Sequence, residues 1–181
     1  LVSRLATTTK AVPEALDGYD VVGATATLET LVDDLSNWYV RLSRRRFWRG
    51  GMEDDKIAAY RTLRGVLLAL CKLLAPFVPF LSESIYANLR TEGDPESVHL
   101  CAYPAADESG IDAELEAEMA FARCVVALGH QARNQAGIRV RQPLSRVVVR
   151  RPESGALSDA VARLIAYELN VEAVESTEDL E

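Results

Sequence analysis

Four side chains that suit contacts with single-stranded nucleic acid recur along one predicted helix. They are Asn37, Arg41, Arg44 and Trp48, and at 100° per residue they fall within about 60° of one another. Guanidinium groups bind phosphates, an aromatic plane stacks on a base, and an amide recognises a base edge. The pattern therefore predicts an RNA-binding face, on which Asn37 makes a polar contact to a base or a sugar.

The residues next to this face extend it. Arg45 and Arg46 add two cations for phosphates, and Phe47 is the alternative to Trp48 as the ring that stacks on a loop base. A second interpretation is a solvated helix end, because arginines near a helix C-terminus complement the dipole and Trp48 can close the core. Composition and spacing leave both interpretations open.

A second basic segment, residues 133–144, offers further contacts. We predict that Arg139, Arg141 and Gln142 contact an RNA backbone. The alternative is an exposed turn whose arginines pair with two acidic segments, residues 107–118 and 168–181. For three later arginines this pairing is the preferred interpretation: Arg146, Arg150 and Arg151.

Catalytic and metal-binding patterns are absent from the sequence. There is no GxSxG, GxxxxGK[ST], HExxH or GxGxxG motif, so a self-contained active site is not expected. The cysteines form no CxxC pair, and His99 and His130 stand at no ligand spacing from them, so no metal site is predicted. Cys71 and Cys124 lie on apolar helix faces and are expected in the core, and free thiols are typical of a reducing cytoplasm.

The average charge of the chain conceals a segregated distribution. With 20 Lys and Arg against 27 Asp and Glu, the net charge of −7 would argue against a nucleic-acid partner. Yet residues 41–49 and 119–152 contain arginines and no acid. The longest apolar stretch, residues 66–81, is interrupted by Lys72 and two prolines and falls short of the roughly 20 residues that a membrane span needs. No membrane contact is therefore expected.

Helical periodicity dominates the first two thirds of the chain. Helices are predicted over residues 1–15, 21–48, 53–75 and 80–90, the third being central because it becomes apolar on nearly all sides. Gly18 is expected to be the left-handed cap of the first helix. The second helix carries one predicted core stripe: Leu28, Leu31, Leu35, Trp38 and Leu42.

The periodicity changes towards the C-terminus. A short extended piece is predicted at residues 98–100, and a helix over residues 113–135 is expected to end at Gly137. A strand within residues 137–151, a helix over 157–170 and a strand over 171–174 follow. The expected fold is mainly α: an antiparallel helical bundle over residues 1–136 with a small C-terminal α/β module over residues 137–181.

Four blocks of sequence, in the same order, resemble the anticodon-binding domain of isoleucyl-tRNA synthetases, which are class Ia aminoacyl-tRNA synthetases. The blocks are residues 37–48, 75–83, 97–104 and 138–144. The resemblance implies a bundle that cradles the anticodon arm of tRNA(Ile), followed by a junction module. It also implies a parent enzyme of translation that ligates isoleucine to tRNA with ATP and Mg. The signatures for that chemistry, HIGH and KMSKS, are missing here.

The chain is accordingly expected to be a fragment that does not catalyse aminoacylation and has no cofactor of its own. The expected partners are tRNA(Ile) and the remaining domains of the parent synthetase, in a cytoplasmic monomer. Two alternatives remain at this stage. One is the anticodon-binding domain of a valyl-tRNA synthetase, and the other is a helical protein-interaction module that does not bind RNA.

Overall fold

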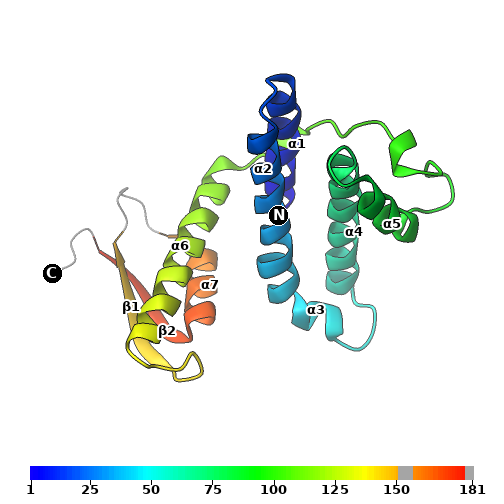
Figure 1. The fold of residues 1–181 in the computed structure, drawn as a ribbon. Coiled ribbons are helices and arrows are strands. Elements are labelled where there is room, and N and C mark those ends of the chain that lie inside the picture. The colour runs from blue at the N-terminus through cyan, green and yellow to red at the C-terminus, as the bar shows by residue number, and fades with distance from the viewer. Residues whose placement is uncertain (151–156, 178–181) are drawn as a thin grey trace. The chain divides into compact units, whose positions relative to one another are not determined.

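The computed structural model describes residues 1–150 and 157–177 (Figure 1). The chain divides into two compact units, residues 1–111 and 112–181, which are described separately below. Helices dominate both units, and a two-stranded sheet lies in the second. The predicted mainly α fold with a small C-terminal α/β module is confirmed.

The first unit begins with two helices joined by a tight turn, α1 (Val2–Asp17) and α2 (Val21–Asp33). The N–H groups of Tyr19 and Asp20 donate to the carbonyls of Leu16 and Ala15, which is the hydrogen-bond pattern of a Schellman motif. In this motif the left-handed position falls on Tyr19, with φ of 59°, whereas Gly18 has φ of −82°. The prediction of Gly18 as the left-handed cap is therefore wrong by one residue.

The predicted helix 21–48 is not one regular helix. After α2 the backbone widens into a π-helical segment, η1 (Asp34–Val40), and a turn at Ser43 precedes the short helix α3 (Arg44–Trp48). The wide turn accompanies the burial of two consecutive residues, Asp34 and Leu35. The Asp34 carboxylate lies 3.4 Å from Nε of Arg4 on α1, so the inward turn of this acid is compensated by an ion pair.

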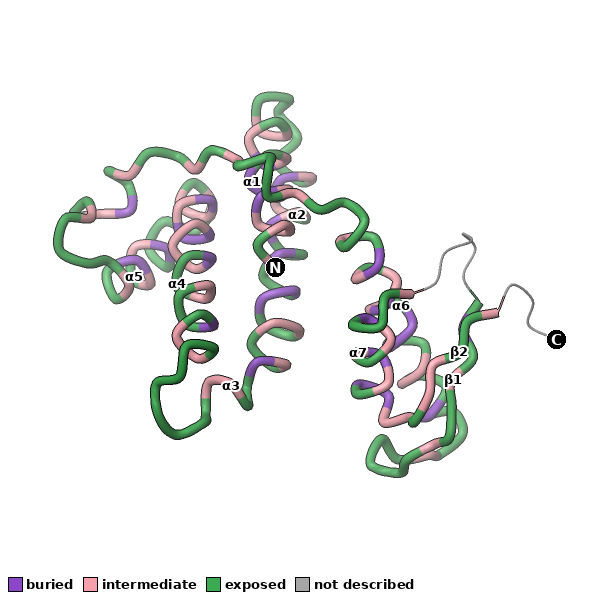
Figure 2. Tube along the Cα trace, turned by 180° about the vertical axis from the view of Figure 1, so that it is seen from behind, coloured by how far each residue is buried: buried purple, intermediate pink, exposed green. Residues whose placement is uncertain are grey.

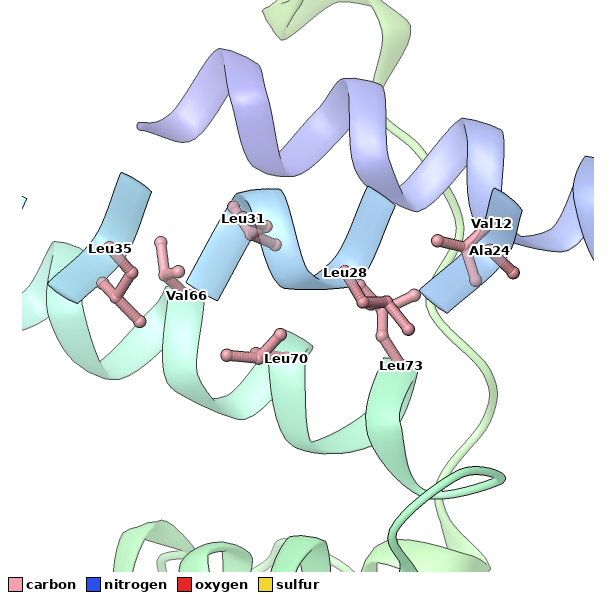
Figure 3. Close-up of a cluster of buried hydrophobic side chains, with 8 residues drawn as sticks. All are labelled: Val12, Ala24, Leu28, Leu31, Leu35, Val66, Leu70 and Leu73. Atoms are coloured by element: carbon pink, nitrogen blue, oxygen red, sulfur yellow. The ribbon is translucent and has the colours of Figure 1, made fainter. Parts of the chain in front are cut away.

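Helix α4 (Asp54–Leu74) is central to the first unit, as predicted, because two different core clusters lie against it. Figure 3 shows the larger cluster, formed by eight aliphatic residues of α1, α2, η1 and α4: Val12, Ala24, Leu28, Leu31, Leu35, Val66, Leu70 and Leu73. The stripe of the second predicted helix is confirmed as far as Leu35. Beyond it Tyr39, not Trp38, packs against this cluster, and Leu42 is half-buried.

The smaller cluster joins α4 to α5 (Pro79–Leu89) and to a 3₁₀ turn, η2 (Val98–Leu100). The extended piece predicted at 98–100 is wrong, because a capping network bends the chain there. Glu83 accepts hydrogen bonds from Ser97 Oγ (2.9 Å) and from the Val98 N–H (2.8 Å), and Ser97 Oγ accepts one from the His99 N–H (3.2 Å). The bonds from Val98 and Ser97 hold the pKa of Glu83 below its usual value. A second 3₁₀ turn, η3 (Glu108–Gly110), ends this unit.

The second unit is a helix followed by a β–α–β element. Helix α6 (Ala113–Gln135) leads into β1 (Leu144–Arg150), α7 (Asp159–Leu169) and β2 (Val171–Thr177). The two strands pair in parallel, from Leu144 opposite Val171 to Arg150 opposite Thr177. Each of these elements was predicted within a few residues, and Gly137, with φ of 68°, ends α6 as expected.

Helix α6 packs against α7, and its Gly129 lies where an added Cβ would meet Leu169. In the structure α6 belongs to the second compact unit, whereas the sequence-based prediction included it in the helical bundle. The assignment of residues 1–136 and 137–181 to separate functional domains stays a prediction. Cys124 on this helix is exposed, so its expected core position is wrong, whereas Cys71 on α4 is buried.

Within the described residues, no helix has both the length and the apolar character needed to cross a membrane.

Candidate nucleic-acid interface

The ring of Trp48 is the most exposed aromatic group of the basic helix end, the name used here for residues 37–48. Its exposed fraction is 78%. The guanidinium carbon of Arg44 lies 5.2 Å from the centroid of the ring, within the range of a cation–π contact. Figure 2 shows the chain from α3 into the start of α4 as exposed over most of its length. An indole and a guanidinium are therefore presented together to solvent.

A second indole–guanidinium pair lies one turn earlier. Arg41 lies over Trp38 at 5.8 Å from the ring centroid, and its Nε donates to the carbonyl oxygen of Asn37 at 2.7 Å. The Asn37 side chain donates to the carboxylate of Asp33. Asn37 and Arg41 are both exposed, but one N–H of the Asn37 amide is already engaged with an acid.

Arg46 is bound by an acid on α4. Its Nε donates to Asp55 Oδ2 at 2.9 Å, and its Nη2 donates to Asp55 Oδ1 at 2.7 Å and to the Asp55 carbonyl at 3.2 Å. This bidentate contact lowers the pKa of Asp55 below its usual value and raises that of Arg46. The guanidinium expected at an RNA phosphate thus joins α3 to the first turn of α4.

Phe47 is also part of the fold. Its ring lies 6.3 Å from that of Tyr39 in an edge-to-face arrangement and 5.0 Å from that of Tyr60 on α4. The Tyr39 hydroxyl donates to the carbonyl oxygen of Ala59 at 3.0 Å, which fixes that ring in turn. Phe47 is half-buried, so Trp48 is the better placed of the two candidate stacking rings.

Two further arginines lie within the basic helix end and directly after it. Arg45 is exposed, as expected for a phosphate contact. Arg49, just after α3, has its Nη1 3.8 Å from a carboxylate oxygen of Glu53, and both side chains are largely exposed. An ion pair this exposed, at 3.8 Å, contributes little to stability. Lys56 donates to the Arg49 carbonyl at 2.7 Å and so helps to end α3.

Two indole–guanidinium pairs lie within the basic helix end, Trp38–Arg41 and Trp48–Arg44. The π-helical turn of η1 and the turn at Ser43 interrupt the regular spacing of 100° per residue on which the predicted RNA-binding face was based, and that face stays a prediction. Trp38 is the residue that sequence reasoning missed, since it was assigned to the core stripe. The signal that identifies it is the Trp–x–x–Arg spacing, which places ring and guanidinium on one side of a helical turn.

The other predicted contacts lie in the cationic loop, residues 137–143 of the second unit. Arg139, Arg141 and Gln142 all have exposed side chains, and the Gln142 N–H donates to the Arg139 carbonyl at 2.9 Å, which closes a turn. The loop belongs to the second compact unit and the basic helix end to the first.

Arg146, Arg150 and Arg151 are the arginines expected to pair with acidic segments. Arg146 lies 3.2 Å from a carboxylate oxygen of Glu175 on the neighbouring strand, so its predicted pairing with the acidic segment 168–181 is confirmed. Arg150 is exposed on β1. Arg151 lies outside the described residues.

The basic helix end exposes cations, an indole ring and an amide, and the cationic loop of the other unit exposes two guanidinium groups and an amide. No group of three or more His, Cys, Asp or Glu side chains suited to a metal ion occurs in the part of the chain that the structure describes. Side chains of these kinds suit the recognition of a polyanion with accessible bases. The fold that carries these surfaces is a mainly α domain with a small α/β module.

Comparisons with known proteins give the family. Residues 1–149 match the model of the anticodon-binding domain of tRNA ligases, and the chain belongs to that family. It is 49% identical to an isoleucine–tRNA ligase of Clostridium acetobutylicum over 99% of its length, and 46% identical to that of Thermobifida fusca over 94%. The enzyme of the same name from Chlamydia abortus is 41% identical over 96% of this chain.

The matched region is a small part of each relative. The chain spans 17% of the Clostridium acetobutylicum and Chlamydia abortus proteins and 16% of the Thermobifida fusca protein. The resemblance inferred from the four sequence blocks is confirmed by these matches.

Proposed function

We propose that this chain binds the anticodon stem-loop of tRNA(Ile) as the tRNA-recognition part of an isoleucine–tRNA ligase. The observation that carries the proposal is the exposed Trp48 ring with Arg44 beside it, in a chain that is 49% identical along nearly its whole length to a protein of that name. An open ring next to a cation suits an unpaired loop base and its phosphate.

Each side chain has a proposed role. Trp48 stacks on a loop base, and Asn37 makes a polar contact to a base or a sugar. Phosphates are contacted by three arginines: Arg41, Arg44 and Arg45. Trp38 is added as a second ring beside Arg41. Arg46 and Phe47 are assigned to holding α3 in place, because an ion pair and two aromatic rings already engage them. The exposed side chains of the cationic loop contact the RNA backbone: Arg139, Arg141 and Gln142.

The proposal extends to the protein of which this chain spans a small part. That protein would ligate isoleucine to its tRNA with ATP and Mg in the cytoplasm, as a monomer, and its other domains would carry the chemistry. This chain alone is proposed to bind RNA without catalysing aminoacylation and without a cofactor of its own.

The proposed function is tested by titrating the 181-residue chain with a labelled anticodon stem-loop of tRNA(Ile) and following fluorescence anisotropy. The controls are a hairpin with a scrambled loop and the stem-loop of a valine tRNA. If roughly four phosphates are neutralised, the slope of log affinity against log salt is expected to be about −3. Trp48→Ala and Arg44→Ala are expected to weaken binding.

Three results would count against parts of the proposal. Equal affinity for the scrambled hairpin and the isoleucine stem-loop would remove sequence recognition. A preference for the valine stem-loop would point to the valine enzyme. No RNA binding at any salt concentration would leave the helical protein-interaction module.

A further inference from the structure

The guanidinium group of Arg133, near the end of α6, is buried, with 5% of the residue exposed, and it contacts backbone carbonyls on two segments. Its Nη1 donates to the carbonyls of Arg139 (3.1 Å) and Gln142 (3.0 Å) in the cationic loop. Its Nη2 donates to those of Leu169 (2.6 Å) and Asn170 (3.2 Å) at the end of α7. The planar fork of arginine can serve several acceptors at once, so this single side chain joins the loop to α7.

Asn170, at the end of α7, joins the same two segments through its own side chain and backbone. It ends α7 in the left-handed conformation, with φ of 51° and ψ of 56°. Its Nδ2 donates to the Val140 carbonyl at 3.0 Å, and its own carbonyl accepts the Leu144 N–H at 3.2 Å as well as Arg133 Nη2. Asparagine is one of the few residues besides glycine that adopt this conformation readily, which places its short amide within reach of the loop.

These bonds decide which groups of the cationic loop are available to a ligand. The carbonyls of three loop residues are engaged within the second unit: Arg139, Val140 and Gln142. The side chains of Arg139, Arg141 and Gln142 are all exposed. Figure 1 shows the loop running from the end of α6 into β1. These three backbone acceptors are thus engaged in hydrogen bonds, while two cations and an amide are exposed, and this arrangement favours an anionic ligand.

We propose that Arg133 and Asn170 are positioning residues that hold the cationic loop in one conformation, in which Arg139 and Arg141 meet the phosphates of an RNA backbone. This inference rests on the proposed function. A loop that is already ordered loses less conformational entropy on binding than a mobile one, so its cations bind more tightly for the same contacts. The buried charge of Arg133 also adds to the positive potential of the loop.

The variant Asn170→Gly tests the role of the side chain, because glycine retains the left-handed backbone and removes only the bond to Val140. Loss of one ordering hydrogen bond is expected to weaken stem-loop affinity by about 3- to 10-fold. Thermal unfolding is expected to change little, since glycine favours this backbone conformation. Tyr19→Gly, at a left-handed position of the first unit, is the matched control and should leave the affinity unchanged.

Arg133→Lys provides an independent test. A lysine retains the charge, but its single ammonium group cannot serve the four carbonyls that Arg133 holds, so a larger loss of affinity is expected. Hydrogen exchange at the Gln142 and Leu144 amides, both hydrogen-bonded in the structure, should accelerate in either variant.

A double-mutant cycle separates positioning from general stability. If Asn170 acts through the loop cations, Asn170→Gly will cost little affinity in a chain that already carries Arg139→Ala and Arg141→Ala. Fully additive losses would overturn the inference, and so would unchanged affinity of Asn170→Gly and Arg133→Lys in a chain that still binds the stem-loop. Failure of the unaltered chain to bind any stem-loop would instead overturn the proposed function.

Discussion

Arg46 holds the carboxylate of Asp55 through two hydrogen bonds, of 2.9 Å from Nε and 2.7 Å from Nη2. The contact joins α3 to the first turn of α4, and so it fixes the segment that presents Trp48. Arg44, two residues earlier, instead lies over the Trp48 ring. Arginines that look equivalent in sequence therefore have different roles, one orienting the basic helix end and the other available to a ligand.

Asp55→Asn is predicted to change how the free energy of unfolding depends on pH below neutrality. Because Arg46 holds the pKa of Asp55 below its usual value of 3.8, the ionised carboxylate stabilises the fold at neutral pH. That contribution is fully present above the unfolded-state pKa and is lost as pH falls through the lower folded-state pKa. Urea unfolding at pH 7, 5 and 3 should show a destabilised variant at pH 7 and a smaller difference from the unaltered chain at pH 3. An equal difference at all three values would show that the charge is not responsible.

The same ion pair gives a prediction for RNA binding. Arg46→Ala should weaken stem-loop affinity less than Arg44→Ala, once both are measured at a temperature where each variant is folded. An equal or greater loss for Arg46→Ala would show that this guanidinium leaves Asp55 to contact RNA.

Trp48→Ala and Phe47→Ala are predicted to have opposite consequences although the residues are adjacent. Stacking on a base is worth about 1–3 kcal/mol, so Trp48→Ala should weaken stem-loop binding by about 5- to 150-fold. Its effect on unfolding should stay within about 0.5 kcal/mol, because the ring is exposed. Phe47→Ala removes a ring packed between Tyr39 and Tyr60 and should destabilise the first unit by about 1–3 kcal/mol.

The two aromatic variants are distinguished by titration and by denaturant unfolding on the same samples. Trp48→Phe is the matched control, since it retains a ring for stacking and should recover part of the lost affinity. A Phe47→Ala chain that is as stable as the unaltered one yet binds RNA poorly would reverse the two roles.

Sequence periodicity predicted most helices to within a few residues because their ends carry local signals. Pro79 begins α5, Gly137 follows the end of α6, and Asp54 and Asp55 lie in the first turn of α4. One error arises where a side chain distant in sequence determines the backbone. Glu83 bends residues 97–100 into a 3₁₀ turn, and nothing within that segment signals the contact.

The candidate site shows the same limit. Trp48 and Arg44 are exposed and lie four residues apart within α3, a spacing that can be read from the sequence. The pairing of Arg46 with Asp55 spans a loop, and the π-helical segment accompanies the burial of Asp34 next to Arg4 of another helix. Neither can be read from spacing along a single helix. Arg133 is the clearest case, since its four acceptors lie 6 to 37 residues away in sequence.

Tyr19→Gly is predicted to stabilise the first unit. A non-glycine residue in the left-handed conformation is disfavoured by about 1–2 kcal/mol, and the Tyr19 side chain is almost fully exposed, so little packing is lost. We expect a gain of about 1 kcal/mol in the free energy of unfolding. Gly18→Ala should add a smaller gain, because φ of −82° suits alanine and an added Cβ would have only ordinary contacts at 3.5 Å. Denaturant unfolding checks both variants, and a loss of stability for Tyr19→Gly would contradict the Schellman geometry.

Gly129→Ala and Gly65→Ala make the same change in the middle of two helices, and opposite results are predicted. At Gly129 on α6 an added Cβ would lie 2.5 and 2.6 Å from the two terminal carbons of Leu169, which is itself buried. Overpacking of this kind costs about 1–3 kcal/mol. At Gly65 on α4 no atom lies within 4 Å of the added Cβ, so alanine should stabilise that helix by about 0.5–1 kcal/mol.

The pair of glycine variants also tests the packing on which the cationic loop depends. Leu169 and Asn170 supply carbonyls to Arg133, so displacing Leu169 should disturb the loop as well as the contact between α6 and α7. Hydrogen exchange of the Gln142 amide should therefore accelerate in Gly129→Ala and stay unchanged in Gly65→Ala. If Gly129→Ala destabilised α6 and α7 while the loop amides kept their protection, the loop would have a source of order other than the end of α7.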